Sequence, residues 1–148
     1  MTHSHRHKSI TAAYLILKKD GKLLLLRRSN TGYCDGLFGL PSGHVDEGEP
    51  VIDAMVREAK EEIDIKVHPD NLKLIHVRDR KALDGHRIDF FFECEKWEGD
   101  PVNVEPHKCS ELSWVENGES HPDLIPYIKE TINLASKGDI YSLEEWKQ

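Results

Sequence analysis

The chain has 148 residues, a formal net charge of −7 at neutral pH and a hydrophobic fraction of 38%. This length suits one domain, and no apolar run reaches the roughly 20 residues of a membrane span. Its 20 Lys and Arg residues are scattered, which excludes the basic face that a nucleic-acid polymer requires. We expect a cytoplasmic domain over residues 9–148, after a flexible N-terminus at residues 1–8, that binds a small molecule and no membrane.

The first part of the chain predicts a β-hairpin followed by a loop. Residues 9–19 (SITAAYLILKK) are apolar and β-branched, Asp20-Gly21 is a hairpin turn signal, and residues 22–28 (KLLLLRR) form the returning strand. Five glycines and two prolines mark residues 29–50 as mostly loop.

Two groups of metal-ligating residue types stand outside these elements. A metal site at His3, His5 and His7 is one interpretation of the N-terminus, and a free polar segment is the simpler one. The three cysteines form no CxxC pair, which indicates free thiols in a reducing compartment; they are Cys34, Cys94 and Cys109.

A helix is predicted to start at Pro50, because a proline at the first helical position loses no hydrogen bond. Apolar residues then recur at helical spacing and predict a buried stripe: Ile52, Met55, Val56, Ala59 and Ile63. Further strands are predicted over residues 72–79 and 87–94, around a polar turn with Asp84 and Gly85. A short strand over 111–115 and a second helix over 122–135 follow. This order suits an α/β fold, a mixed sheet with helices packed on its faces.

The first helix carries an acidic cluster within residues 57–62 (REAKEE). Glu58, Glu61 and Glu62 stand at i, i+3 and i+4, so their side chains are neighbours beside the apolar stripe. Like charges at this spacing cost a few tenths of a kcal/mol each, and Mg²⁺ or Mn²⁺ would reverse that cost. A solvated face with ion pairs from Arg57 and Lys60 is the alternative, and the helix alone does not decide between them.

Residues 43–65 (GHVDEGEPVIDAMVREAKEEIDI) resemble the Nudix box of the Nudix hydrolase superfamily. The box has a glycine, five residues, a glutamate, seven residues and then an REXXEE segment. The matching positions are Gly43, Glu49, Arg57, Glu58, Ala59, Glu61, Glu62 and Ile65. The chain departs from the box at Asp64, where a glycine is usual, and at Ala59, where a larger apolar residue is usual. Asp64 tolerates the left-handed conformation that such a glycine adopts.

The resemblance implies the Nudix α/β/α sandwich, with a mixed sheet between helices, and cleavage of a diphosphate linkage with Mg²⁺ or Mn²⁺. It implies that Glu58 and Glu62 are the main metal ligands, that Glu61 completes the cluster, and that a backbone carbonyl around Ser42 and Gly43 is a further ligand. Arg57 matches the arginine that orients a glutamate, and Glu49, in a structural role, is its expected partner.

The general base in this superfamily varies, and the candidates here are Glu61, Glu105 and Glu111, with Glu105 preferred outside the box. Arg28 matches a phosphate-contacting arginine of the MutT branch, and Arg27 and Arg87 are weaker candidates. Stacking on a nucleobase is a further possibility for aromatic residues, namely Tyr33, Phe38 and Phe91.

The resemblance leaves the substrate open. Residues 78–84 (RDRKALD) lack the proline and tyrosine marks of ADP-ribose and diadenosine polyphosphate enzymes. A MutT-like nucleoside triphosphate pyrophosphohydrolase is therefore favoured over an ADP-ribose, nucleotide-sugar or dinucleotide pyrophosphatase. The rivals from other classes are a non-catalytic nucleotide-sensing module and an isopentenyl diphosphate isomerase that uses a cysteine such as Cys34 or Cys94. The partner expected is a small nucleotide, and the protein is expected to be a monomer or a homodimer.

Overall fold

A computed structural model describes residues 6–144 of the chain. His3 and His5 lie outside the described residues, whereas the Nε2 atom of His7 lies 2.9 Å from the Nδ1 atom of His86. Within the described range, no helix has the length and apolar character needed to cross a membrane.

The predicted N-terminal hairpin is present with its turn where the sequence places it. Strand β1 (Ile10–Lys19) and strand β2 (Lys22–Arg28) pair antiparallel. Asp20 and Gly21 between them both have positive φ, 51° and 75°, as a two-residue type I′ turn requires. Strand β2 then pairs antiparallel with β3 (Phe38–Gly39) and with β7 (Cys109–Glu116).

The sheet is mixed because two of its pairings are parallel. Strand β1 runs parallel to β6 (Gly85–Cys94), and β6 pairs antiparallel with β5 (Lys73–Ala82). At the edge, β5 pairs in parallel with β8 (Tyr141–Glu144). The order is β3-β2-β1-β6-β5-β8, while β4 (Ser42–His44) pairs antiparallel with β1. Short 3₁₀ turns at Pro69–Asn71 (η1) and Gly118–Ser120 (η2) complete the described structure.

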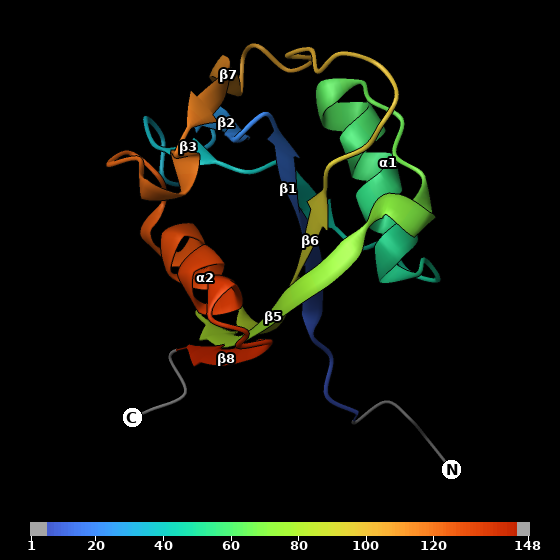
Figure 1. Cartoon of the computed structure of the whole chain (residues 1–148). Helices are drawn as coiled ribbons and strands as arrows, with labels where there is room; N and C mark the ends of the chain where they lie inside the picture. The colour runs from blue at the N-terminus through green and yellow to red at the C-terminus, as the bar shows by residue number, and fades with distance from the viewer. Residues whose placement is uncertain (1–5, 145–148) are drawn as a thin grey trace.

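One helix covers each face of the sheet, as Figure 1 shows for β1 and β6 between α1 (Val51–Ile63) and α2 (Pro126–Ser136). Successive residues of β1 point to opposite faces. Leu15 and Leu17 therefore join Met55 of α1 in one core cluster, and Ile16 joins Ile128 of α2 in the other. The predicted α/β/α sandwich is confirmed.

The two helices start later than the sequence predicted. Pro50 is the N-cap of α1, with an extended backbone (φ −63°, ψ 146°), so the helix begins at Val51. Helix α2 begins at Pro126, four residues after the predicted start. The preceding residues instead connect to β3: Leu124 forms a bridge with Phe38, and the Ile125 N–H donates to the Phe38 carbonyl at 2.9 Å.

The C-terminus of α1 adopts the left-handed conformation expected at Asp64, with φ 56° and ψ 41°. Its N–H donates to the Lys60 carbonyl at 3.1 Å, and its carboxylate pairs with Lys60 at 2.6 Å on the surface. This conformation costs a residue with a Cβ about 1 kcal/mol, more than an exposed ion pair contributes. Asp64→Gly is therefore expected to raise the melting temperature by a few degrees. Asp64→Asn, which keeps the Cβ, should leave it nearly unchanged; a lower melting temperature for Asp64→Gly would contradict this account.

Candidate active site

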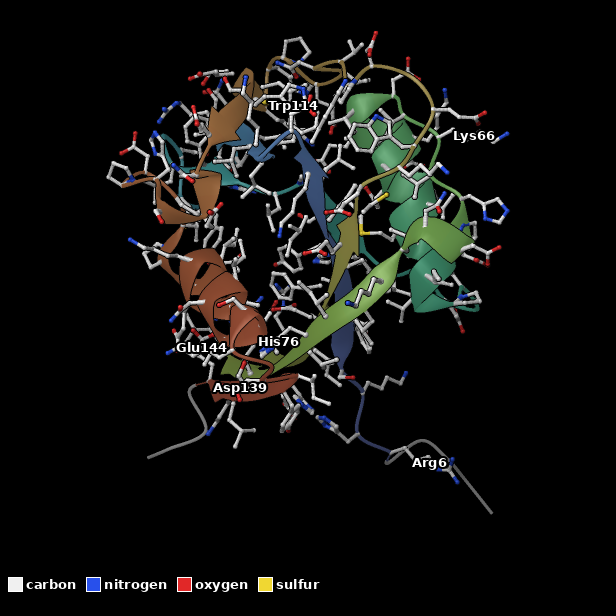
Figure 2. The ribbon with its side chains drawn as sticks, viewed as in Figure 1. Arg6, Lys66, His76, Trp114, Asp139 and Glu144 are labelled. Atoms are coloured by element: carbon white, nitrogen blue, oxygen red, sulfur yellow. The ribbon has the colours of Figure 1, made fainter. Side chains whose placement is uncertain are left out.

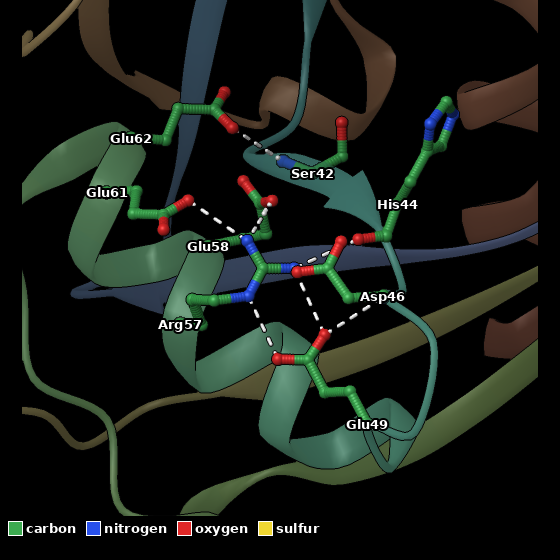
Figure 3. Close-up of polar contacts among 8 residues, drawn as sticks. All are labelled: Ser42, His44, Asp46, Glu49, Arg57, Glu58, Glu61 and Glu62. Carbon is green, nitrogen blue, oxygen red and sulfur yellow. Dashed lines mark hydrogen bonds and ion pairs between the residues drawn. The ribbon is translucent and has the colours of Figure 1, made fainter.

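Arg57 of α1 is the centre of the acidic cluster (Figure 3). Its Nε and NH2 atoms donate to the two carboxylate oxygens of Glu49 at 2.9 and 3.1 Å, a bidentate pair. Its NH1 atom donates to Glu58 at 2.7 Å and to Glu61 at 3.0 Å. NH2 also donates to the His44 carbonyl at 3.0 Å, which ties α1 to β4. The expected contact with Glu49 is present, and Arg57 holds two further box glutamates as well.

One guanidinium does not balance the charge of this cluster. Glu49, Glu58 and Glu61 all contact Arg57, and Asp46 lies 3.5 Å away. The hydrogen bond from Arg57 lowers the pKa of Glu49. Burial nevertheless raises the pKa of Glu58, despite its own bond to Arg57. The cluster therefore has an excess of negative charge that a divalent cation would offset.

Gly43 of β4 allows the Glu58 carboxyl group to lie directly against the backbone of that strand. A Cβ built at Gly43 would stand 2.0 Å from Cδ of Glu58 and 2.3 Å from its Oε1. A Cβ there would force the flexible end of the Glu58 side chain into another position, so the place that Glu58 occupies against β4 depends on glycine. This is a physical reason for the first glycine of the box in this chain.

Glu62 lies one turn further along the same helix, and its side chain contacts Ser42, the first residue of β4. Its Oε2 accepts the Ser42 N–H at 3.2 Å. Burial raises the pKa of Glu62 to about 8, and the charges of Glu58 and Glu105 add to this effect, while the Ser42 N–H opposes it. A carboxylate this short of positive charge gains from a bound cation.

The residues present fit a hard divalent ion, because the side chains gathered beside β4 offer carboxylate oxygen. The glycine opening at Gly43 and the raised pKa values of Glu58 and Glu62 agree with that fit. Across residues 6–144, no three carboxylate, imidazole or thiolate groups already lie close enough to share one ion. Glu58 and Glu61 are instead held by Arg57, so they must turn from it, at least in part, to coordinate an ion.

Two pockets meet beside the acidic cluster. The large pocket has a volume of about 1060 Å³ and the small pocket about 160 Å³. Arg28, Ser42 and Lys108 line both of them. The small pocket also contains Glu62 and Glu105. Six cationic side chains line the large pocket, in contrast to the acidic chain as a whole: Arg28, Arg78, Arg80, Lys81, Arg87 and Lys108.

Two of the predicted substrate-binding arginines lie in the large pocket. Arg28 follows a register irregularity in the pairing of β2 with β7, and such bulges redirect side chains. Its Nε donates to the Tyr33 carbonyl at 2.7 Å, and its guanidinium lies 5.6 Å from the centre of the Tyr33 ring. Arg87 lines the same pocket, with NH2 3.2 Å from Nε2 of His44. Their roles in binding stay predictions.

Arg27 and Phe38 are placed differently from our expectation. Phe38 is a core residue that is 2% exposed, and the Arg27 guanidinium stacks on its ring at 4.0 Å. Arg27 also donates to Glu111 and to Asp123, both at 3.1 Å. Neither residue lines the two pockets described above, so we do not retain them as substrate contacts. Phe91 is fully buried as well.

The two candidate bases outside the box, Glu105 and Glu111, lie in different surroundings. Glu105 lies in the small pocket with Glu62. Glu111 instead accepts bonds from Arg27 and from the Ser113 hydroxyl, and these bonds lower its pKa. Of the two, Glu105 is therefore the candidate that remains beside the cluster.

Several pocket residues were not predicted from the sequence. Arg78 and Arg80 alternate along β5 and face the large pocket, where Tyr127 of α2 and Glu144 of β8 also lie. Their only signal was the alternation of two arginines in a strand with buried neighbours, which is ambiguous because strand arginines usually face water.

Comparisons with known proteins agree with this geometry. A family model described as the NUDIX domain matches residues 6–133. An ADP-ribose pyrophosphatase from Methanocaldococcus jannaschii is 38% identical over 77 residues, which are 52% of this chain but only 45% of that protein. An 8-oxo-dGTP diphosphatase from Escherichia coli is 28% identical over 94 residues, 64% of this chain and 71% of that protein. The crystal structure of a MutT NUDIX hydrolase from Burkholderia pseudomallei superposes with a TM-score of 0.74 at 26% identity and covers 89% of this chain and 98% of that one.

Proposed function

Because the chain belongs to the Nudix family, we propose that it hydrolyses the diphosphate linkage of a nucleoside triphosphate or another nucleoside diphosphate derivative. The observation that carries this proposal is that Glu62 of the acidic cluster lines the small pocket together with Glu105, where that pocket meets the large one. Carboxylates there adjoin Arg28 and Lys108, so anionic phosphates and their cations would meet at one place.

We propose Mg²⁺ or Mn²⁺ as the cofactor, held by Glu58 and Glu62, with Glu61 and a backbone carbonyl near Gly43 as further ligands. When bound, such an ion neutralises charge that develops on the phosphate oxygens. The arginine contacts support the assignment, since Arg57 and Glu49 fix α1 against the loop that leads to it.

The remaining polar groups of the junction have separate roles in this proposal. Arg28 and Lys108 bind phosphate oxygens, and Arg87 binds a part of the substrate further along the large pocket. Glu105 or Glu61 accepts the proton of the attacking water. Glu105 is partly exposed and lies 3.9 Å from Lys108, a position from which it reaches solvent water.

A nucleotide panel tests the proposal. The purified protein is incubated with nucleoside triphosphates, nucleotide sugars and dinucleotides in Mg²⁺ or Mn²⁺, and released phosphate and pyrophosphate are measured. We expect turnover of at least one of these groups and a loss of at least about 100-fold in Glu58→Gln. A panel without turnover would leave a nucleotide-sensing module, and near-normal turnover by Glu58→Gln would remove the metal assignment.

ADP-ribose is the second candidate substrate, and one observation favours it. The ADP-ribose pyrophosphatase is 38% identical over its matched segment, against 28% for the 8-oxo-dGTP diphosphatase. ADP-ribose therefore belongs in the same panel, and the ratio of its kcat/KM to that of the nucleoside triphosphates decides between the two.

A further inference from the structure

We propose that Glu144, the last residue of β8, determines the specificity of the large pocket. The part of that pocket lined by Arg78, Arg80 and Glu144 is called the far end below, and Glu144 selects substrates whose group at the far end is uncharged. This inference rests on the proposed function, because it concerns the substrate of the same site. Strand β8 covers Tyr141–Glu144, beyond the residues 6–133 that match the family. The family match therefore does not account for this carboxylate.

Strand β8 is held in a defined position against the sheet. It pairs in parallel with β5, with Val77 opposite Tyr141 and Arg80 opposite Glu144. The fully buried ring of His76 bridges to it, with Nδ1 2.8 Å from the Asp139 carbonyl and Nε2 2.8 Å from the Ser142 hydroxyl. Because a carbonyl only accepts, Nδ1 carries the proton. Figure 2 shows His76, Asp139 and Glu144 gathered at this edge.

Glu144 supplies a negative charge that a buried arginine requires. The Arg78 side chain is 5% exposed, forms an ion pair with Glu144 through NH2, and stacks on the Tyr127 ring at 4.2 Å. Its NH1 donates to Oδ2 of Asp89 at 3.1 Å, and Nε of Arg80 donates to the same oxygen at 3.0 Å. Two guanidiniums thus share one Asp89 oxygen, and Glu144 provides the second carboxylate.

The far end of the large pocket is therefore balanced in charge. Arg78 and Arg80 are matched by Asp89 and Glu144, and Arg87, which lines the same pocket, lies 3.4 Å from the Asp84 carboxylate. Lys81 lines the pocket too but is exposed, where solvent screens its charge.

A second anion beside Arg78 and Arg80 would meet guanidiniums that already have carboxylate partners, and it would lie close to the Glu144 carboxylate. Such like-charge contacts discriminate against a ligand. An uncharged group with N–H or O–H donors can instead bond to the Glu144 carboxylate. The phosphates are left to Arg28 and Lys108, which line both the large and the small pocket.

Calorimetry in EDTA tests this with two ligand pairs that differ by one distal anion. The first pair is AMP and adenosine 2′,5′-bisphosphate, and the second is glucose 1-phosphate and glucuronate 1-phosphate. The wild-type protein is expected to bind the neutral member of at least one pair about tenfold more tightly. Glu144→Gln should bring that ratio to about one or reverse it. Glu130→Gln, which makes the same charge change on an exposed residue of α2, should keep the wild-type ratio.

The pair whose ratio responds identifies the part of the substrate that lies at the far end. A response of the adenosine pair indicates the nucleoside ribose, and a response of the glucose pair indicates the group linked to the diphosphate. Three outcomes would overturn the inference. The wild type binds both members of each pair equally, the ratio is unchanged in Glu144→Gln, or neither protein binds either pair. No cation or turnover enters this measurement. Failure here therefore leaves the hydrolase proposal intact, whereas a nucleotide panel without turnover would count against the hydrolase proposal, on which this inference rests.

Discussion

Replacing Glu62 with glutamine should abolish hydrolysis and yet stabilise the metal-free protein at pH 8. Activity should fall by at least about 100-fold, since a neutral amide replaces a proposed cation ligand. Stability should change in the opposite direction because of the proton that Glu62 binds. Its pKa is about 8 in the folded protein, against an ordinary value of 4.5.

Between pH 4.5 and 8 the folded state therefore holds a proton that the unfolded chain releases. The free energy of unfolding of the wild type must fall as the pH rises through this window. Glutamine does not titrate, so Glu62→Gln should match the wild type near pH 5 and exceed it by on the order of a few kcal/mol at pH 8. Urea unfolding in EDTA at several pH values measures the difference.

Glu61→Gln is the matched control, because the Glu61 side chain is 58% exposed and pairs with Arg57 at the surface. Its pH dependence of stability should follow that of the wild type. A Glu62→Gln protein that loses stability in parallel with the wild type between pH 5 and 8 would show that Glu62 is not held protonated. Adding Mn²⁺ at pH 8 should stabilise the wild type far more than the Glu62→Gln variant.

The second large effect is expected from one methyl group, in Gly43→Ala. The added Cβ would lie 2.0 Å from Cδ of Glu58, so either the carboxylate or β4 has to move. The contacted atoms are the flexible end of the Glu58 side chain, so the carboxylate moves first and the loss of stability should be small. A shift of about 1 Å in a catalytic group costs on the order of 100-fold in rate, so turnover should fall much more than the free energy of unfolding.

Gly39→Ala in β3 serves as the comparison for Gly43→Ala. Its Cβ would meet Cδ1 of Ile125 at 3.4 Å, an ordinary contact. This variant should keep most of its activity and stability. Full activity in Gly43→Ala would mean that Glu58 acts from a position that does not depend on the glycine at residue 43.

The acidic helix and the hairpin could be predicted from the sequence because their signals are local. The spacing of apolar residues in α1, the Asp20-Gly21 turn and the left-handed Asp64 all depend on neighbouring residues. Strands β3 and β4 lay in a segment predicted as loop, since strands of two and three residues exist only through pairing with β2 and β1. Strand β8 was missed for the same reason: its exposed Tyr141 and Leu143 give no sign of the partner β5.

The site was predictable in the box and not in the pocket. The contact between Arg57 and Glu49 is implied by the resemblance to the Nudix box, and the structure contains it. Phe38 is predicted as a substrate contact because an aromatic ring can stack on a nucleobase, but its bridge to Leu124 and its burial place it in the core. Arg78 and Glu144 meet only after β5 and β8 pair across a long stretch of chain, which no local pattern reports.

The parallel alignment of β1 with β6 has a kinetic consequence. Ile10 lies opposite Arg87, so this pairing closes a loop of more than seventy residues before any of its hydrogen bonds can form. Loop closure over that distance loses chain entropy early, and topologies rich in such contacts refold in milliseconds to seconds. We expect helix α1 to gain helical structure before β4 is fixed beside it, so that catalytic competence is among the last properties recovered on dilution from denaturant.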